Sequence, residues 1–105
     1  MRFLIPTMAA ILLAMSCSAQ AELTDRQAML LANTCLQCHA REHIGVPVFG
    51  VPDDWKGPNK QGEERMLRNV IEGLRGMPPL GSCAACDDND LRALNRELSG
   101  LKGGK

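Results

Sequence analysis

The chain has 105 residues, its 12 Lys and Arg balance its 12 Asp and Glu, and aromatic residues make up only 3% of it. A balanced charge, with no basic stripe interleaved with aromatics, argues against nucleic acid as a partner. A small domain with so few large side chains lacks material for a self-sufficient hydrophobic core, so we expect a bound group to fill its centre.

The first residues, 1–21, have the features of a secretory signal peptide. An apolar run covers Phe3–Met15, and the small-x-small ending Ala19-Gln20-Ala21 is typical of a cleavage site. We therefore expect export to the periplasm and one mature domain over residues 22–105. The apolar run is too short to cross a bilayer, so no membrane span is expected. Lipidation of Cys17 is the alternative reading of this segment.

A first helix is predicted from about Asp25 into the segment Cys35–His39. Thr24-Asp25-Arg26-Gln27 has the pattern of a capping box, with Thr24 as N-cap. The spacing i, i+3, i+4 and i+7 predicts one apolar face, made of Ala28, Leu31, Ala32 and Cys35.

The segment Cys35-Leu36-Gln37-Cys38-His39 is a C-x-x-C-H motif, which is typical of c-type haem attachment. In such a motif both thiols bond covalently to the porphyrin, and the histidine becomes the proximal iron ligand. We expect Cys35 and Cys38 to attach one haem c, His39 to bind its iron, and the haem to fill the centre of the domain.

Residues 40–61 show no sustained period and are rich in Gly and Pro, which predicts irregular chain. A second helix is predicted over Glu63–Leu74, since its apolar residues Leu67, Val70, Ile71 and Leu74 recur at helical spacing. Met77-Pro78-Pro79 prevents its continuation. A last helix is predicted to begin after the N-cap Asp87 and to run to about Ser99, with Leu91, Leu94 and Leu98 on one side. The predicted fold class is all-α.

Several motifs together resemble the class I cytochromes c, and within them the small cytochrome c5-like group. The resemblance covers Cys35 to about Leu98. It is carried, after the C-x-x-C-H motif and in matching spacing, by Gly45-Val46-Pro47, Trp55, Gly62, Met77-Pro78-Pro79, Gly81-Ser82-Cys83-Ala84-Ala85-Cys86 and Asp87-Asp88.

The resemblance implies three main helices wrapped around one covalently bound haem. It also implies that Met77 is the distal iron ligand and that Cys83 and Cys86 form a disulfide beside it. A thioether ligand is soft and neutral and raises the reduction potential, which suits one-electron transfer. Candidate haem-pocket residues are Pro47, Trp55, Leu67, Ile71 and Leu80. Ile44, Val46 and Leu80 are expected to ring the haem edge as a small docking surface for brief encounters.

Two features depart from the group. The crossing of the first and last helices lacks the usual glycine and aromatics, so Ala28, Leu31, Leu94 and Leu98 predict a purely aliphatic contact. Pro58 stands where an arginine commonly meets a haem propionate. Neither departure affects the expected iron ligands.

The resulting hypothesis is a periplasmic electron carrier, not an enzyme, that shuttles single electrons between redox partners not named by the sequence. One alternative is the haem c subunit of an exported oxidoreductase complex. Another is a structural module in which Cys35, Cys38, Cys83 and Cys86 hold zinc or act as thiols. The long interval between the two cysteine pairs, and the unexplained His39, count against that module.

Overall fold

The computed structural model describes residue 2 and residues 22–101, and these are helical with irregular connections. The signal peptide and Cys17, predicted above, lie outside the described residues apart from Arg2. The described elements are α1 (Asp25–Asn33), α2 (Leu36–His39), α3 (Pro52–Asn59), α4 (Glu63–Glu72), the 3-10 helix η1 (Pro79–Ser82) and α5 (Asp88–Ser99). The all-α prediction is confirmed. Within residues 22–101, no helix is long and apolar enough to cross a membrane.

Helix α1 starts as predicted but ends before the attachment motif. Thr24 caps it in a complete capping box with Gln27. The prediction of one helix running into the motif is wrong, because α1 stops at Asn33 and a separate helix, α2, begins at Leu36. At the break, the hydroxyl of Thr34 donates to the carbonyl of Leu30 over 2.7 Å. A threonine that bonds to the preceding turn competes with the regular helix.

The predicted apolar face of α1 is also partly wrong. Leu31 is buried, but Ala28 and Ala32 are exposed. The helix instead turns Gln27, Leu30 and Leu31 inward, because Gln27 reaches a polar partner on α5 (described below) and the two leucines bury more apolar area than alanines would.

Helix α3 was not predicted, since residues 40–61 were expected to be irregular throughout. Pro52 occupies the first turn, where a proline loses no helical hydrogen bond. Asp53 and Asp54 follow and complement the positive end of the helix dipole. Pro58 lies in the last turn, and the helix ends at Asn59. The prolines thus mark the ends of a short helix.

Helices α4 and α5 follow the predictions closely. Helix α4 ends at Glu72, short of the predicted Leu74, because Gly73 takes a positive φ of 86°. Helix α5 has Asp87 as N-cap and runs to Ser99, and Gly100 closes it in a left-handed conformation. Leu91, Leu94 and Leu98 are all buried, which confirms the predicted face.

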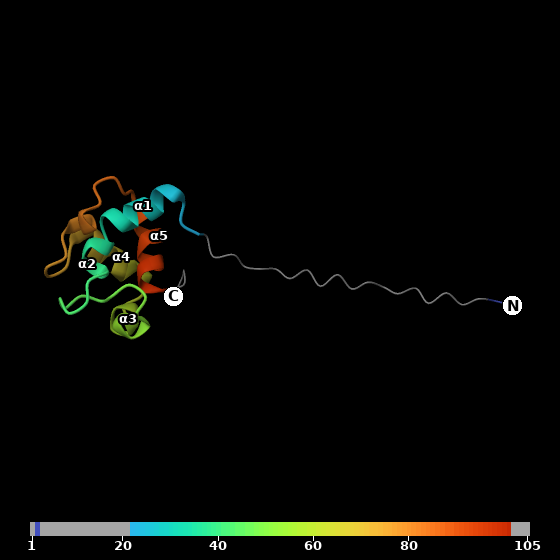
Figure 1. Cartoon of the computed structure of the whole chain (residues 1–105), viewed down its shortest axis with the longest axis horizontal. Coiled ribbons are helices and arrows are strands. Elements are labelled where there is room, and N and C mark those ends of the chain that lie inside the picture. The colour runs from blue at the N-terminus through green and yellow to red at the C-terminus, as the bar shows by residue number, and fades with distance from the viewer. Residues whose placement is uncertain (1, 3–21, 102–105) are drawn as a thin grey trace.

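The helices enclose two hydrophobic clusters. α5 contacts α1, α3 and α4, and α4 also contacts η1; α1 lies near one end of α5 and α3 near the other (Figure 1). The first cluster contains Leu31, Trp55, Met66, Leu94 and Leu98. The second contains Leu67, Cys83 and Leu91. Leu30 and Cys86 pack against both clusters and join them into one core.

Ion pairs fix the start of α4 on α5. The buried carboxylate of Glu63 accepts hydrogen bonds from Nε and Nη2 of Arg96, and Arg92 pairs with Glu64 over 2.6 Å. These carboxylates raise the pKa of each arginine, chiefly through the hydrogen bonds that Arg96 donates to Glu63 and that Arg92 donates to Glu64.

Candidate haem-binding site

His39 is held by two hydrogen bonds to the loop that follows α2. Its Nδ1 lies 2.7 Å from the carbonyl oxygen of Pro47, and its own carbonyl accepts the N–H of Phe49 over 2.7 Å. A carbonyl can only accept, so Nδ1 carries the proton and Nε2 presents its lone pair. Iron-binding histidines are commonly oriented by such a bond from the second ring nitrogen. The His39 side chain therefore fits the role of a haem ligand.

Helix α3 holds the loop that orients His39, through hydrogen bonds to the main chain of Val48. The indole N–H of Trp55 donates to the carbonyl of Val48 over 2.9 Å, and Oδ2 of Asp54 accepts the N–H of Val48 over 3.1 Å. Val48 follows Pro47 directly, so both contacts steady the carbonyl that orients His39. The rings of Trp55 and His39 also pack, with centroids 5.4 Å apart. Trp55 thus lies in the core and packs directly against His39. Its indole N–H is already hydrogen-bonded to the carbonyl of Val48.

Of the two cysteines of the motif, Cys35 caps the start of α2 and Cys38 lies within it. Cys35 is half-buried and Cys38 is exposed. The N–H of His39 donates to the carbonyl of Cys35 over 2.9 Å, so Cys35 and His39 stand one helical turn apart. Thr34 lies 3.6 Å from the sulfur of Cys35.

Met77 lies in a tightly constrained loop between α4 and η1. It exchanges two main-chain hydrogen bonds with Leu74, of 2.9 and 3.1 Å, in an isolated antiparallel bridge. Its side chain is half-buried, and its methyl carbon lies next to Gly81. Pro78 and Pro79 follow and fix their own φ angles. The main chain at Met77 is therefore held from both sides.

Cys83 and Cys86 form a disulfide directly after η1, with Cα atoms 5.4 Å apart. The candidate pocket residues Leu67, Ile71 and Leu80 gather around it, together with Leu91. Leu67 and Ile71 also line a groove of about 330 Å³ between α4 and α5, whose other walls are charged. The candidates Pro47 and Trp55 gather instead around His39.

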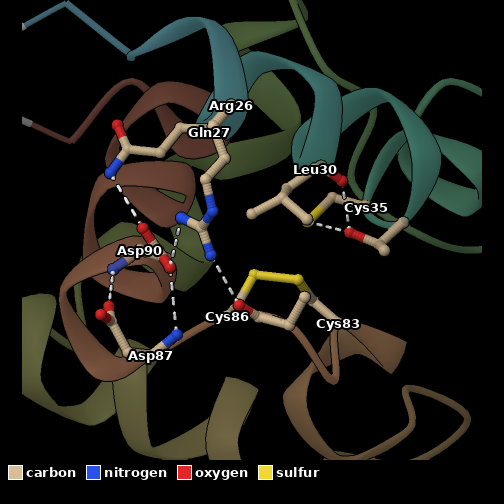
Figure 2. Close-up of a disulfide and its surroundings, with 10 residues drawn as sticks. Arg26, Gln27, Leu30, Cys35, Cys83, Cys86, Asp87 and Asp90 are labelled. Carbon is tan, nitrogen blue, oxygen red and sulfur yellow. Dashed lines mark hydrogen bonds and ion pairs between the residues drawn. A yellow bond between two sulfur atoms is a disulfide. The ribbon is translucent and has the colours of Figure 1, made fainter.

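A polar clamp beside the disulfide was missed by the sequence analysis (Figure 2). The buried carboxylate of Asp90 accepts hydrogen bonds from the side chains of Arg26, at 2.9 Å, and Gln27, at 3.2 Å. Arg26 also donates to the carbonyl of Ala85, inside the disulfide loop, over 2.7 Å. The hydrogen bond from the main chain of Asp87, and then those from Arg26 and Gln27, lower the pKa of Asp90. The clamp ties α1, α5 and the disulfide loop together.

This clamp corrects the prediction that α1 and α5 cross through a purely aliphatic contact. Leu31, Leu94 and Leu98 do pack together, but a buried carboxylate and its two partners lie beside them. Arg26 and Asp90 are far apart in sequence, and the local signals, Gln27 and Asp90 each as third residue of a capping box, did not predict that they meet.

The site geometry does not fit a four-cysteine zinc module. Two of the four sulfurs are consumed by the Cys83–Cys86 disulfide and cannot act as thiolates. Over the part of the chain that the structure describes, no group of three or more His, Cys, Asp or Glu side chains is arranged to hold a metal ion.

An all-α domain with a C-x-x-C-H helix and an oriented histidine has the architecture of a c-type cytochrome. Comparison with known proteins agrees. A family model described as cytochrome c oxidase, cbb3-type, subunit III matches residues 14–96. Cytochrome c5 of Ectopseudomonas mendocina is 35% identical over 74 residues, which cover 69% of this chain and 85% of that protein. Cytochrome c5 of Azotobacter vinelandii is also 35% identical over 74 residues, and 89% of it is covered.

A solved structure gives the same result. The match is a chain from the crystal structure of the electron-transfer complex of nitrite reductase with cytochrome c, with a TM-score of 0.66 and 29% identity. It covers 75% of this chain and 96% of that one. The chain belongs to the class I cytochrome c family, next to the cytochromes c5. It is a c-type cytochrome of electron transfer, not an enzyme, and its cofactor is covalently attached haem c.

Proposed function

We propose that this cytochrome is an exported, one-electron carrier whose haem iron is bound by His39 and Met77, with thioether bonds to Cys35 and Cys38. The observation that carries the proposal is the hydrogen bond from Nδ1 of His39 to Pro47, because it leaves Nε2 available to iron. The bound haem would supply an iron that alternates between Fe(III) and Fe(II).

The protein's own residues set the conditions for that exchange. The hydrogen bond to Pro47 makes His39 a stronger donor, and the bonds from α3 to Val48 keep it in place. The thioether of Met77 favours Fe(II) and raises the potential. The prolines after Met77 limit the movement of the loop, so little rearrangement accompanies a change in charge.

Partners are proposed to be larger redox proteins that dock briefly. Ile44 is 50% exposed, and Val46 and Leu80 are half-buried, which gives apolar side chains for a small docking surface. The related chain in a complex with nitrite reductase supports redox proteins as the class of partner. A second candidate function is that of a haem subunit within an oxidoreductase, which the description of the matching family favours.

Export is proposed from the signal peptide pattern of residues 1–21. Mass spectrometry of the protein from the periplasmic and membrane fractions tests it: cleavage after Ala21 would give a chain that starts at Glu22, whereas lipidation would give a membrane-held chain that starts at an acylated Cys17. Size-exclusion chromatography of the periplasmic fraction, and of the detergent-solubilised membrane fraction, separates the two functions. A free carrier elutes as a small protein, and a subunit elutes with its complex or stays with the membranes.

Two measurements test the haem assignment, using protein exported together with haem-maturation machinery. Denaturation and extraction with acidified solvent should leave the haem on the polypeptide; extractable haem would contradict attachment through Cys35 and Cys38. The oxidised protein should show the weak near-infrared band of sulfur-to-iron charge transfer. The Met77→Ala variant should lose this band and have a lower potential. A band that survives in Met77→Ala would exclude Met77 as the ligand.

A further inference from the structure

Helix α4 is flanked by two glycines that have nearly the same backbone conformation. Gly62 has φ 83° and ψ 163°, and Gly73 has φ 86° and ψ 154°. Residues with a side chain rarely adopt this region, so replacing either glycine by alanine strains the backbone to a similar degree. The two positions share this backbone conformation but differ in the atoms that surround them.

The space around Gly73 is filled by the loop that carries Met77. A Cβ at Gly73 would lie 2.9 Å from the carbonyl oxygen of Met77 and 3.1 Å from the nitrogen of Pro79. Both are main-chain atoms, which can move only if the loop moves. A Cβ at Gly62 would have no atom within 4 Å. The main chain of Met77, the residue proposed as the distal ligand, therefore packs directly against the Cα of Gly73, in space that any side chain at position 73 would occupy.

The side chain of Met77 rests on a second glycine. A Cβ at Gly81 would lie 3.4 Å from the methyl carbon of Met77. Gly81 has φ 56° and stands between Leu80 and Ser82, which also have positive φ angles, of 60° and 64°. This turn brings Gly81 back over Met77. The carbonyl of Met77 is thus seated on Gly73 and its methyl group on Gly81.

We infer that Gly73 and Gly81 form a cradle that positions Met77 as the distal ligand and limits how often its sulfur leaves the iron. The inference rests on the proposed ligation by Met77. Neither glycine offers a ligand atom, so both act through Met77. A methyl group added at Gly73 would displace the main chain at Met77 and raise the fraction of molecules with an open distal position, whereas one added at Gly81 would meet the Met77 methyl group only at contact distance.

The test compares holoproteins that carry single alanine substitutions with matched controls. Gly62→Ala is the control for Gly73→Ala, because the backbone angles match but the space is open. Gly100→Ala is the control for Gly81→Ala, because Gly100 is also left-handed, at φ 71°, with no atom within 4 Å of a Cβ. The measurements are the near-infrared band, the potential, the affinity of the oxidised protein for imidazole and the unfolding midpoint.

Gly73→Ala should bind imidazole roughly tenfold more tightly or better, since apparent affinity rises in proportion to the open fraction. Its near-infrared band should weaken and its potential should fall. Gly81→Ala should change these readouts in the same direction but by less, because 3.4 Å is a milder contact. Both controls should lower the unfolding midpoint like their partners yet keep the imidazole affinity of the wild type.

The inference is overturned if Gly73→Ala matches Gly62→Ala in imidazole affinity and potential, while Met77→Ala loses the band. That result would leave ligation by Met77 intact. If Met77→Ala keeps the band, the proposed ligation itself has failed, and the cradle fails with it. If Gly73→Ala yields no holoprotein, the comparison of Gly81→Ala with Gly100→Ala decides, and equal imidazole affinities would overturn the cradle.

Discussion

Replacing Trp55 by phenylalanine should weaken both the fold and the orientation of His39. Phenylalanine keeps an aromatic ring beside the histidine but removes the N–H that binds the carbonyl of Val48. The loss of this partly buried hydrogen bond costs about 1–2 kcal/mol. Trp55 is only 5% exposed, and the smaller ring leaves space in the core, at a further cost of about 1 kcal/mol.

The sum, about 2–3 kcal/mol, corresponds to a fall in the unfolding midpoint of roughly 10–20 °C for a domain of this size. The potential should rise at the same time. A looser Val48 weakens the neighbouring bond between Pro47 and His39, so the histidine donates less to the iron and stabilises Fe(III) less.

Thermal unfolding followed by circular dichroism, with redox titration of the same holoprotein, measures both effects. Phe49→Leu is the control. It removes an aromatic ring from the loop that contains Pro47 and Val48, but it leaves the main-chain hydrogen bond between position 49 and His39. Asp54→Ala should raise the potential by the same route with a smaller loss of stability, and Asp54→Asn, which keeps an acceptor for Val48, should not. A Trp55→Phe protein with the midpoint and potential of the wild type would show that Trp55 neither stabilises the fold nor orients His39 through Val48.

Three further predictions concern the core and the clamp beside the disulfide. Since hydrogen bonds from Asp87 and Arg26 lower the pKa of Asp90, its contribution to stability is complete above the ordinary carboxyl pKa of about 3.9 and is lost as the pH falls through the lowered pKa. Asp90→Asn should therefore be less stable than the wild type at pH 7, with a difference in unfolding free energy that shrinks in acid; a difference constant with pH would contradict this. Replacing both Cys83 and Cys86 by serine should leave the haem attached but speed the exchange of distal ligands, seen as faster imidazole binding in stopped-flow; unchanged binding would count against a role in holding the loop. Leu94→Ala, at a site 1% exposed, should cost about 2–5 kcal/mol in denaturant unfolding, and a loss below 1 kcal/mol would show that the core refills the space.

The elements that sequence patterns predicted well are those set by local rules. The capping box at Thr24 and the N-cap Asp87 each depend on a few neighbouring residues, and both were found where expected. The three leucines of α5 recur at helical spacing and are buried together. The C-x-x-C-H motif is likewise local, and together with the motifs that follow it in matching spacing it predicted the family correctly.

The features that were missed depend on contacts between distant residues or on ambiguous signals. Pro52 was interpreted as a breaker, although a proline in the first turn also starts a helix. That error hid α3, and with it the support that Trp55 gives to His39. The partnership of Arg26 with Asp90 has no local pattern, since it exists only once α1 and α5 have docked. The close approach of the Met77 main chain to Gly73 likewise exists only in the folded loop, so no local sequence pattern predicts it.

Methyl NMR of the reduced holoprotein, labelled at the methionine methyl groups, tests directly whether Met77 is bound to the haem iron. A methyl group bound next to the iron lies over the porphyrin face, where the ring current shifts its resonance far upfield. We expect one such resonance, which disappears in Met77→Ala, while the resonances of Met29, exposed on α1, and of Met66, in the core, stay near their ordinary positions. A reduced protein with no shifted methyl resonance, or with one that survives in Met77→Ala, would contradict a haem carrier bound by His39 and Met77.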